Sequence, residues 1–391
     1  MGVKGLKHSL LEKLAENDEF KASISHVSLR VFDGETIAVD FTNLLYKFNR
    51  RNTSYKMEFI NLIHKFKKYG IDLIFVFDGR PDKLKDYVIN HRKVFLDKLQ
   101  KKLDDIIDTY DESVEHDHAI EILTKKTKKI NTRQINECKE LFETLGIRYI
   151  HSNNIEADKI LTYLVKSGVA KCCFSGDMDI IVHGCPILIQ DLDFSLDQVL
   201  KIDYYKLLEA MQLTEEQFRH ACILSGTDYN NSLRHSNINA NFRLIQQYGT
   251  ISNIIINLDE INKDIAVEKH KKFPTRFEWE LCYDIYTTDL DSEITKSIDE
   301  YLAAYILIRR DYIFLDRIKY LILDIQMQSD PKMEKYIRKI KDFILWSYNI
   351  NLTINSSPKP NPKPNPEPDP NPNPNPNSKP GLVSARRRLV F

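Results

Sequence analysis

Short apolar runs that end in aspartate constrain the fold of this chain more than any other feature. The run Thr36–Val39 is followed by Asp40, and the run Ile71–Phe77 is followed by Asp78. Between them, residues Leu44 to Lys68 have the apolar spacing of a helix, which indicates a parallel strand–helix–strand unit. The alternation continues as helix, strand, helix and two strands at Glu137–Leu145, Ile147–Ile150, Ala157–Lys166, Ala170–Phe174 and Pro186–Gln190. We therefore expect an α/β fold with a mostly parallel sheet flanked by helices.

A charged insertion interrupts this alternation. Residues 83–133 carry no strand signal, begin basic, turn acidic from Asp104 to Glu121 and end basic again. This pattern is typical of a solvated helical excursion, and its basic flanks would also suit a clamp that faces phosphate. Both interpretations predict helices in residues 83–133.

The C-terminal part changes character twice. Beyond about Lys201 the pattern is mostly helical through Asn349, and eleven of the fifteen prolines then fall between Pro358 and Pro380. Proline at every second position removes amide donors and favours extended backbone, so this tail is expected to be a disordered spacer. It ends in Arg386, Arg387 and Arg388, a short basic patch of low specificity.

Composition excludes several classes of protein. Lys plus Arg and Asp plus Glu number 56 each, so the chain as a whole is not a histone-like electrostatic binder. The longest apolar run, Tyr301–Ile308, is too short to span a membrane. Six cysteines without a C-x-x-C pair indicate buried thiols in a soluble, intracellular protein. His116 and His118 lie in the acidic middle of the insertion, where we expect solvated loop residues rather than a metal site.

The acids at the strand ends point to a metal site. In a parallel sheet the carboxyl ends of the strands share one edge, where such folds bind ligands. Singly, each acid would serve as a cap or turn former. Together they would repel one another unless cations lay between them, and oxygen ligands without His or Cys favour magnesium or manganese. Two such ions suit phosphodiester hydrolysis. The acids in question are Asp40, Asp78, Glu156, Asp158, Asp177, Asp179 and Asp228.

Six ordered blocks within residues 1–250 resemble the XPG-type structure-specific nucleases, the family that includes flap endonuclease. They are MGVKGL, IAVDFTNLLYKF, IFVFDGRPDKLK, IEADKILTYLVKSG, FSGDMDIIVHG and CILSGTDY. The resemblance implies a PIN-like nuclease core with a helical arch insertion and a helical C-terminal region. It also implies that the seven acids form a two-metal site, although Asp158 stands where family members more often carry Glu. The proline- and asparagine-rich tail is similar to that of nucleases encoded by large DNA viruses.

The same resemblance assigns roles to four other residues. Lys85 and Arg92 match a basic pair at the base of the family's arch, which contacts the scissile phosphate. Tyr46 matches an aromatic residue that stacks on a base, although by itself it would be read as a core residue. Gly2 matches a small residue that lets the backbone approach the substrate.

One stretch departs from the family pattern. In the family, a Gly-Ile-Gly turn after the last metal-binding Asp holds duplex phosphate and a potassium ion. Here the stretch Ser232–Asn241 has His235 and Asn237 in place of the glycines. Because Asn tolerates left-handed backbone, we expect a turn, with less room for phosphate. No sliding-clamp peptide occurs in the tail.

The resemblance implies the following organisation. Residues 1–110 form an N-terminal nuclease region, 83–133 the arch, 134–255 an internal nuclease region with a modified helix–hairpin–helix, 256–350 a helical region and 356–391 the tail.

The expected function is that of a monomeric, magnesium-dependent endonuclease that uses two ions, with manganese as the alternative metal. Its substrate would be 5′ flap, branched or 5′-ended DNA in replication, repair or recombination, and a 5′ exonuclease activity would also fit. Its expected location is the nucleus rather than the cytoplasm. The alternatives are an RNA-cleaving relative of the same fold, a metal-dependent phosphatase acting on small molecules, and a catalytically silent DNA-binding scaffold. The basic insertion argues against the phosphatase, and seven intact acids argue against the scaffold.

Overall fold

The computed structural model describes residues 2–308, apart from 17, 52, 110–113, 153, 264 and 275–276, together with residues 337–342. The proline-rich tail, the terminal arginines and most of residues 309–350 lie outside the described residues. Among the described helices, none combines the length and the apolar character that a membrane span needs.

A seven-stranded sheet forms the centre of the molecule, in the order β1-β7-β6-β5-β2-β3-β4. Strands β6, β5, β2, β3 and β4 run parallel, whereas β7 and β1 are antiparallel to their neighbours. The strands are β1 (Ile24–Ser28), β2 (Thr36–Asp40), β3 (Asp72–Phe77), β4 (Arg148–His151), β5 (Cys172–Phe174), β6 (Ile187–Asp193) and β7 (Gln198–Asp203). The prediction of a mostly parallel α/β sheet flanked by helices is confirmed.

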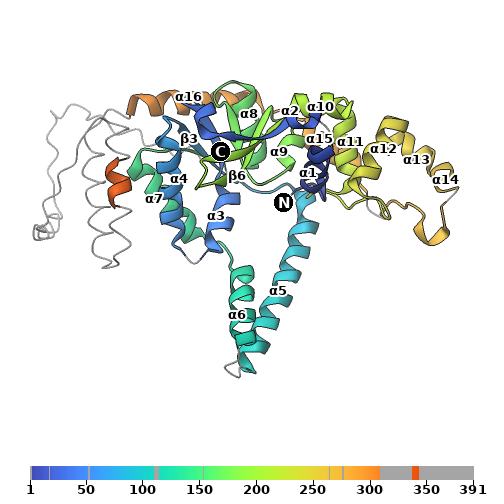
Figure 1. Cartoon of the computed structure of the whole chain (residues 1–391), viewed down its shortest axis with the longest axis horizontal. Coiled ribbons are helices and arrows are strands. Elements are labelled where there is room, and N and C mark those ends of the chain that lie inside the picture. The colour runs from blue at the N-terminus through green and yellow to red at the C-terminus, as the bar shows by residue number, and fades with distance from the viewer. Residues whose placement is uncertain are drawn as a thin grey trace, which may run out of the picture.

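Helices cover both faces of this sheet because its central strands are apolar on both sides. Successive side chains of a strand point to opposite faces. Ile37 and Val39 therefore join one buried cluster with α3 (Phe41–Asn49), α4 (Tyr55–Lys67) and α7 (Thr132–Leu145). Ala38 joins the cluster on the other face, which contains α8 (Ala157–Lys166), α9 (Asp179–Val182), α10 (Tyr204–Met211) and α11 (Glu215–Ser225). Figure 1 shows the sheet between these two layers.

The predicted helix from Leu44 to Lys68 is wrong in one respect, because the structure divides it into α3 and α4. The two helices are separated by a polar stretch in which Arg51 and Thr53 both bond to Glu58. These side-chain bonds hold the connection in a non-helical form, with Ser54 as the N-cap of α4.

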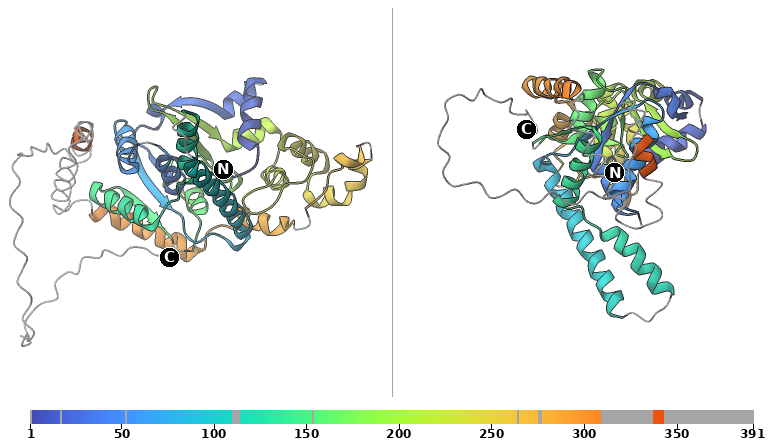
Figure 2. Two further views of the ribbon diagram at one scale, coloured as in Figure 1. Left: turned by 90° about the horizontal axis from the view of Figure 1, so that it is seen from below. Right: turned by 90° about the vertical axis from the view of Figure 1, so that its left-hand side faces the viewer.

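The insertion is a helical hairpin that projects from the body of the molecule (Figures 1 and 2). A short 3₁₀ turn η2 (Lys83–Lys85) leads into α5 (Asp86–Asp108), and α6 (Val114–Thr127) packs against it on the return. His116 and His118 lie on α6, so their predicted loop setting is wrong. At the base, Gln134 Nε2 donates to Asn49 Oδ1 at 2.9 Å, which ties the returning chain to α3.

The remaining helices are mostly C-terminal, as expected beyond Lys201. They comprise α12 (Ile238–Tyr248), α13 (Ile251–Ile256), α14 (Leu258–Asn262), η3 (Val267–Lys269), α15 (Trp279–Thr287) and α16 (Ser292–Ile308). At the other end of the chain are α1 (Leu6–Glu16), α2 (Asp18–Ser23) and η1 (Leu29–Phe32). All six cysteines are free and buried, which confirms the expected thiols.

Candidate active site

Acidic residues gather at the carboxyl edge of three adjacent strands. Asp40 is the last residue of β2, Asp78 directly follows β3, and Asp177 and Asp179 follow β5. Because β5, β2 and β3 are hydrogen-bonded neighbours, the three strand ends lie side by side. The chain proceeds from β2 to β3 on one side and places β5 on the other, which is the kind of crossing point where open α/β sheets bind ligands.

Hydrogen bonds join the loop after β5 to Asp40. The Ser175 hydroxyl donates to Asp40 Oδ2 at 2.6 Å and accepts from the Asp177 amide at 3.0 Å. The Asp179 amide in turn donates to Asp177 Oδ1 at 3.1 Å. Asp40 also accepts from the Asn43 amide at 3.0 Å, as the N-cap of α3. Asp40 therefore serves as a helix cap and as a member of the acidic cluster.

Glu156 and Asp158 reach the same edge from the start of α8. The Ala157 amide, between them, donates to Asp78 Oδ1 at 3.0 Å. Glu156 accepts from the Asp82 amide at 2.8 Å and from the Tyr229 hydroxyl at 2.6 Å. Through Tyr229, the neighbour of Asp228, the loop after α11 joins the cluster.

The electrostatics of this edge favour protonated acids in the absence of cations. Burial, with the charge of Asp78 and then of Asp177, raises the pKa of Asp40 to about 7. Loss of contact with bulk water likewise raises the pKa of Asp177, and raises the pKa values of Asp158 and Asp179 well above the usual range.

The residues fit a magnesium or manganese site by two observations. They offer hard oxygen donors, and Asp179 Oδ1 is buried without a hydrogen-bond partner among the described residues. Yet no three His, Cys, Asp or Glu side chains in the described ranges are already arranged around one point as ligands. The positive charge near the cluster comes instead from the arch.

Two cations of the arch contact acids of the cluster. Lys85 Nζ lies 2.5 Å from Glu156 Oε2 and 4.8 Å from the centre of the Tyr229 ring. Arg92 Nη2 lies 2.7 and 2.8 Å from the two oxygens of Asp228. Burial raises the pKa of Glu156, but Lys85, the Asp82 amide and Tyr229 outweigh burial and leave it below its usual value. Lys85 ends η2 and Arg92 lies nearly two turns inside α5, so the two approach from successive elements.

Of the two other residues assigned by resemblance, Gly2 lies against the acidic cluster and Tyr46 lies on the surface. Gly2 has left-handed backbone, with φ of 83°, and packs against the carboxylates. A Cβ atom there would overlap Asp177 and lie 2.6 Å from Asp179 Oδ1, so only glycine fits. Tyr46 on α3 is 39% exposed, which excludes the core reading. Their contacts with substrate remain predictions.

The structure adds residues that the sequence pattern did not single out. Ser175 and Tyr229 bond directly to the acids, and Tyr286 on α15 lies beside Asp179 and stacks edge-on with Tyr229 at 5.4 Å. Tyr229 is adjacent to Asp228, so its position was visible in the SGTDY block. Tyr286 gave no signal, because only the fold brings α15 to the cluster.

The stretch Ser232–Asn241 forms an ordered turn, as expected. His235 adopts left-handed backbone, with φ of 56°, and Asn237 caps α12 by accepting from the Ala240 amide at 2.9 Å. The Arg234 amide donates to the Lys272 carbonyl at 2.9 Å, so a lysine-containing loop lies beside the turn. A histidine side chain therefore occupies the position where the family has an open glycine backbone.

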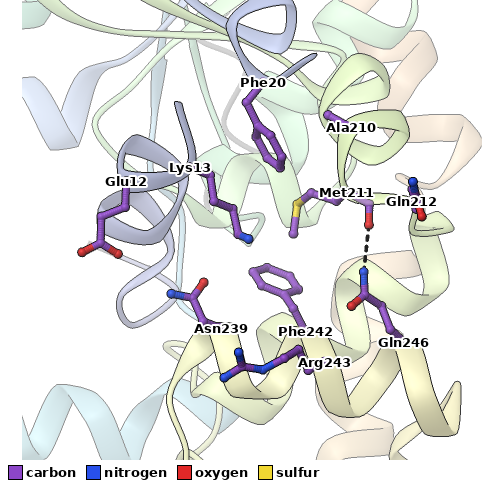
Figure 3. Close-up of a pocket in the computed structure, with 10 residues that line it drawn as sticks. All are labelled: Glu12, Lys13, Phe20, Ala210, Met211, Gln212, Asn239, Phe242, Arg243 and Gln246. Carbon is purple, nitrogen blue, oxygen red and sulfur yellow. Dashed lines mark hydrogen bonds between the residues drawn. The ribbon is translucent and has the colours of Figure 1, made fainter. Parts of the chain in front are cut away.

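A cavity of about 370 Å³ lies elsewhere, between α1, α2, α10 and α12 (Figure 3). Phe20 and Phe242 enter it from opposite sides, and Gln246 Nε2 donates to the Met211 carbonyl at 3.1 Å. None of the seven acids lines it, and its polar residues are all at least partly exposed. It carries no evident chemistry.

Comparison with known proteins identifies two family domains in the chain. The XPG N-terminal domain model matches residues 1–98 and the XPG I-region model matches residues 146–228. The chain is 29% identical to flap endonuclease 1 of Babesia bovis over 65% of its length, a match that spans 38% of that relative. It is 28% identical to flap endonuclease 1 of Entamoeba dispar, over 80% of this chain and 84% of that relative.

A solved structure of the catalytic core of Rad2 in complex with DNA substrate shares the fold. It has a TM-score of 0.57 at 19% identity and covers 74% of this chain and 88% of that one. The viral origin expected from the tail remains a prediction. The two matched regions together contain all seven acids of the cluster. The two matched domains and the flap endonuclease relatives together support an XPG-type, flap endonuclease-like nuclease, which is a phosphodiester hydrolase.

Proposed function

We propose that this chain is a magnesium-dependent, structure-specific DNA endonuclease that cuts 5′ flaps or branched DNA during replication, repair or recombination. The observation that carries the proposal is that acidic and basic side chains lie together at the carboxyl edge of the sheet. Lys85 and Arg92, at the base of the hairpin, contact Glu156 and Asp228, and these two acids lie beside the acids that follow three neighbouring strands. A phosphodiester bound between them would meet ligand carboxylates on one side and cations on the other.

Each side of the site has its own task. The acids would hold two magnesium ions, which when bound supply an activated water and stabilise the leaving oxygen. Lys85 and Arg92 would release Glu156 and Asp228 and turn to the phosphate, where charge develops during cleavage. Tyr46, exposed on α3, would stack on a base near the cut bond. No nucleophilic side chain is needed.

The modified hairpin would change the grip on duplex DNA. Backbone amides at His235 are shielded by a side chain that glycine lacks, so fewer phosphates are neutralised there. The slope of log affinity against log salt is about −0.9 per phosphate contact on duplex DNA. A shallower slope than that of a relative with the Gly-Ile-Gly turn is expected, and a nuclear location fits the DNA substrate.

The deciding experiment is cleavage of end-labelled substrates with and without magnesium. We expect cutting of flap DNA near the junction and little cutting of single-stranded RNA. Asp179→Asn should abolish cutting, whereas the matched control Asp259→Asn, on exposed α14, should cut normally. Preference for RNA would favour the RNA-cleaving alternative, and magnesium-dependent cutting by Asp179→Asn would remove this acid from the mechanism.

A further inference from the structure

A second cavity of about 370 Å³ lies next to the acidic cluster, on the far side of Tyr286. Its walls come from α8, the end of α9, α15 and the start of α16. Tyr286 separates it from the proposed cleavage site, since this side chain lines the cavity and also lies beside Asp179. None of the seven acids contributes to its lining.

The buried part of this cavity is polar and incompletely bonded. Thr162 and His183 line it and are each only 5% exposed. Thr162 Oγ1 and His183 Nε2 have no hydrogen-bond partner in the described part of the chain. A buried polar group without a hydrogen-bond partner is destabilising. Two such groups on one cavity indicate that something bonds to them when the cavity is filled.

The rim of the cavity is basic. Lys159 and Lys166 both line it, and Lys166 Nζ donates to the His183 carbonyl at 3.3 Å. One acid, Asp289, lies on the opposite rim. Because two lysines and one aspartate line the cavity, its net charge is positive and favours a ligand of low negative charge.

We propose that this cavity binds a nucleoside 5′-monophosphate, separately from the cleavage site. The phosphate would lie between Lys159 and Lys166, with hydroxyl donors from Thr162 and Thr295. The nucleoside would lie against the side chains of Tyr286 and Leu290, and the His183 ring would bond to its polar edge. An inorganic phosphate would leave most of the volume empty, whereas the cavity falls within the size range of small-molecule sites.

The test is titration calorimetry of the full chain with dAMP, in EDTA so that magnesium cannot recruit phosphate to the acids. We expect one site per chain, with inorganic phosphate and deoxyadenosine each binding at least 10-fold more weakly. Lys166→Ala and His183→Phe should each weaken dAMP binding at least 10-fold. Lys206→Ala, an exposed lysine on α10, is the matched control and should bind normally.

Thr162→Val separates loss of binding from loss of folding. It keeps the shape of the side chain and removes the unpartnered hydroxyl, so we expect an equal or higher melting temperature together with at least 5-fold weaker dAMP binding. The proposal is overturned if dAMP does not bind at millimolar concentration, if these three variants bind it normally, or if phosphate binds equally well. Loss of binding in Lys85→Ala alone would place the nucleotide at the cleavage site and would also refute it.

Discussion

Replacement of Asp40 by asparagine should stabilise the metal-free protein at neutral and alkaline pH while abolishing cleavage. Asp40 is 5% exposed, and burial and neighbouring acids raise its pKa from 3.8 to about 7. The folded state therefore holds the proton more tightly than the unfolded state does. The stabilisation that the Asp40 carboxyl group contributes to the folded state is complete below about pH 4, falls as the pH rises towards 7, and stays low above that.

The size of the effect follows from the shift. One pKa unit corresponds to 1.36 kcal/mol, so a shift of about three units costs the ionised protein about 4 kcal/mol as an upper value. Asparagine removes this cost and keeps the local geometry. Its oxygen can accept from the Asn43 amide, and its amide can donate to the Ser175 hydroxyl, the two groups that bond to Asp40. Asparagine is also as good an N-cap as aspartate.

The assay is urea unfolding of wild type and Asp40→Asn in EDTA, at pH 5 and pH 8.5. We expect a gain of about 2–4 kcal/mol at pH 8.5, from the bound above, and a smaller gain at pH 5. Magnesium should stabilise the wild type at pH 8.5 and have less effect on the variant. A variant that is less stable than wild type at both pH values, or a gain that does not change with pH, would refute the reasoning.

Three further predictions concern residues around the cluster. Lys85→Ala should slow single-turnover cleavage about 10²–10³-fold with little loss of DNA affinity. Without DNA, this variant should bind magnesium more tightly than wild type, because the ammonium of Lys85 no longer competes for Glu156. Weaker magnesium binding in calorimetry would contradict this. Tyr46→Ala should lose about 1–3 kcal/mol of substrate stabilisation in single-turnover assays, and Tyr46→Phe should retain it; equal losses would exclude stacking. His235→Gly should change the free energy of unfolding by less than about 1 kcal/mol, because relief of left-handed strain offsets the greater freedom of the unfolded chain. It should also bind junctions with long duplex arms more tightly than wild type, and unchanged filter-binding isotherms would show that the histidine does not block phosphate.

The parts of the fold with strong local patterns could be predicted from the sequence. Helix α8 was predicted with its observed ends, Ala157 and Lys166, because its apolar positions repeat with helical spacing. Strands β2 and β3 are apolar on both faces and give continuous apolar runs. Strand β1 was missed because its sequence, ISHVS, is short and half polar. It is a strand only because Ile24 pairs with Ile202, far along the chain.

The same distinction applies to the site. Most of the acids could be predicted because they follow a recognisable strand or begin a helix, whereas Asp228 was visible only as part of a turn after an apolar run. The partners of Lys85 and Arg92 could not, since contacts with Glu156 and Asp228 depend on how the hairpin is oriented over the sheet. Asp82 caps a 3₁₀ turn that ends at Lys85, a detail that apolar spacing does not encode. Tyr286 belongs to a helix that only long-range packing brings to Asp179.

The α5–α6 hairpin has a consequence for how this molecule can diversify. It lies within the connection between β3 and β4, parallel neighbours that pair regardless of what the connection contains. Doubling the length of a flexible connection costs only about 0.6 kcal/mol in closure entropy. Its base is held by separate contacts, such as that between Asn49 and Gln134. Whole helical turns can therefore be added to or removed from its far end, so the reach of the hairpin can vary while the edge that carries the acids keeps its geometry.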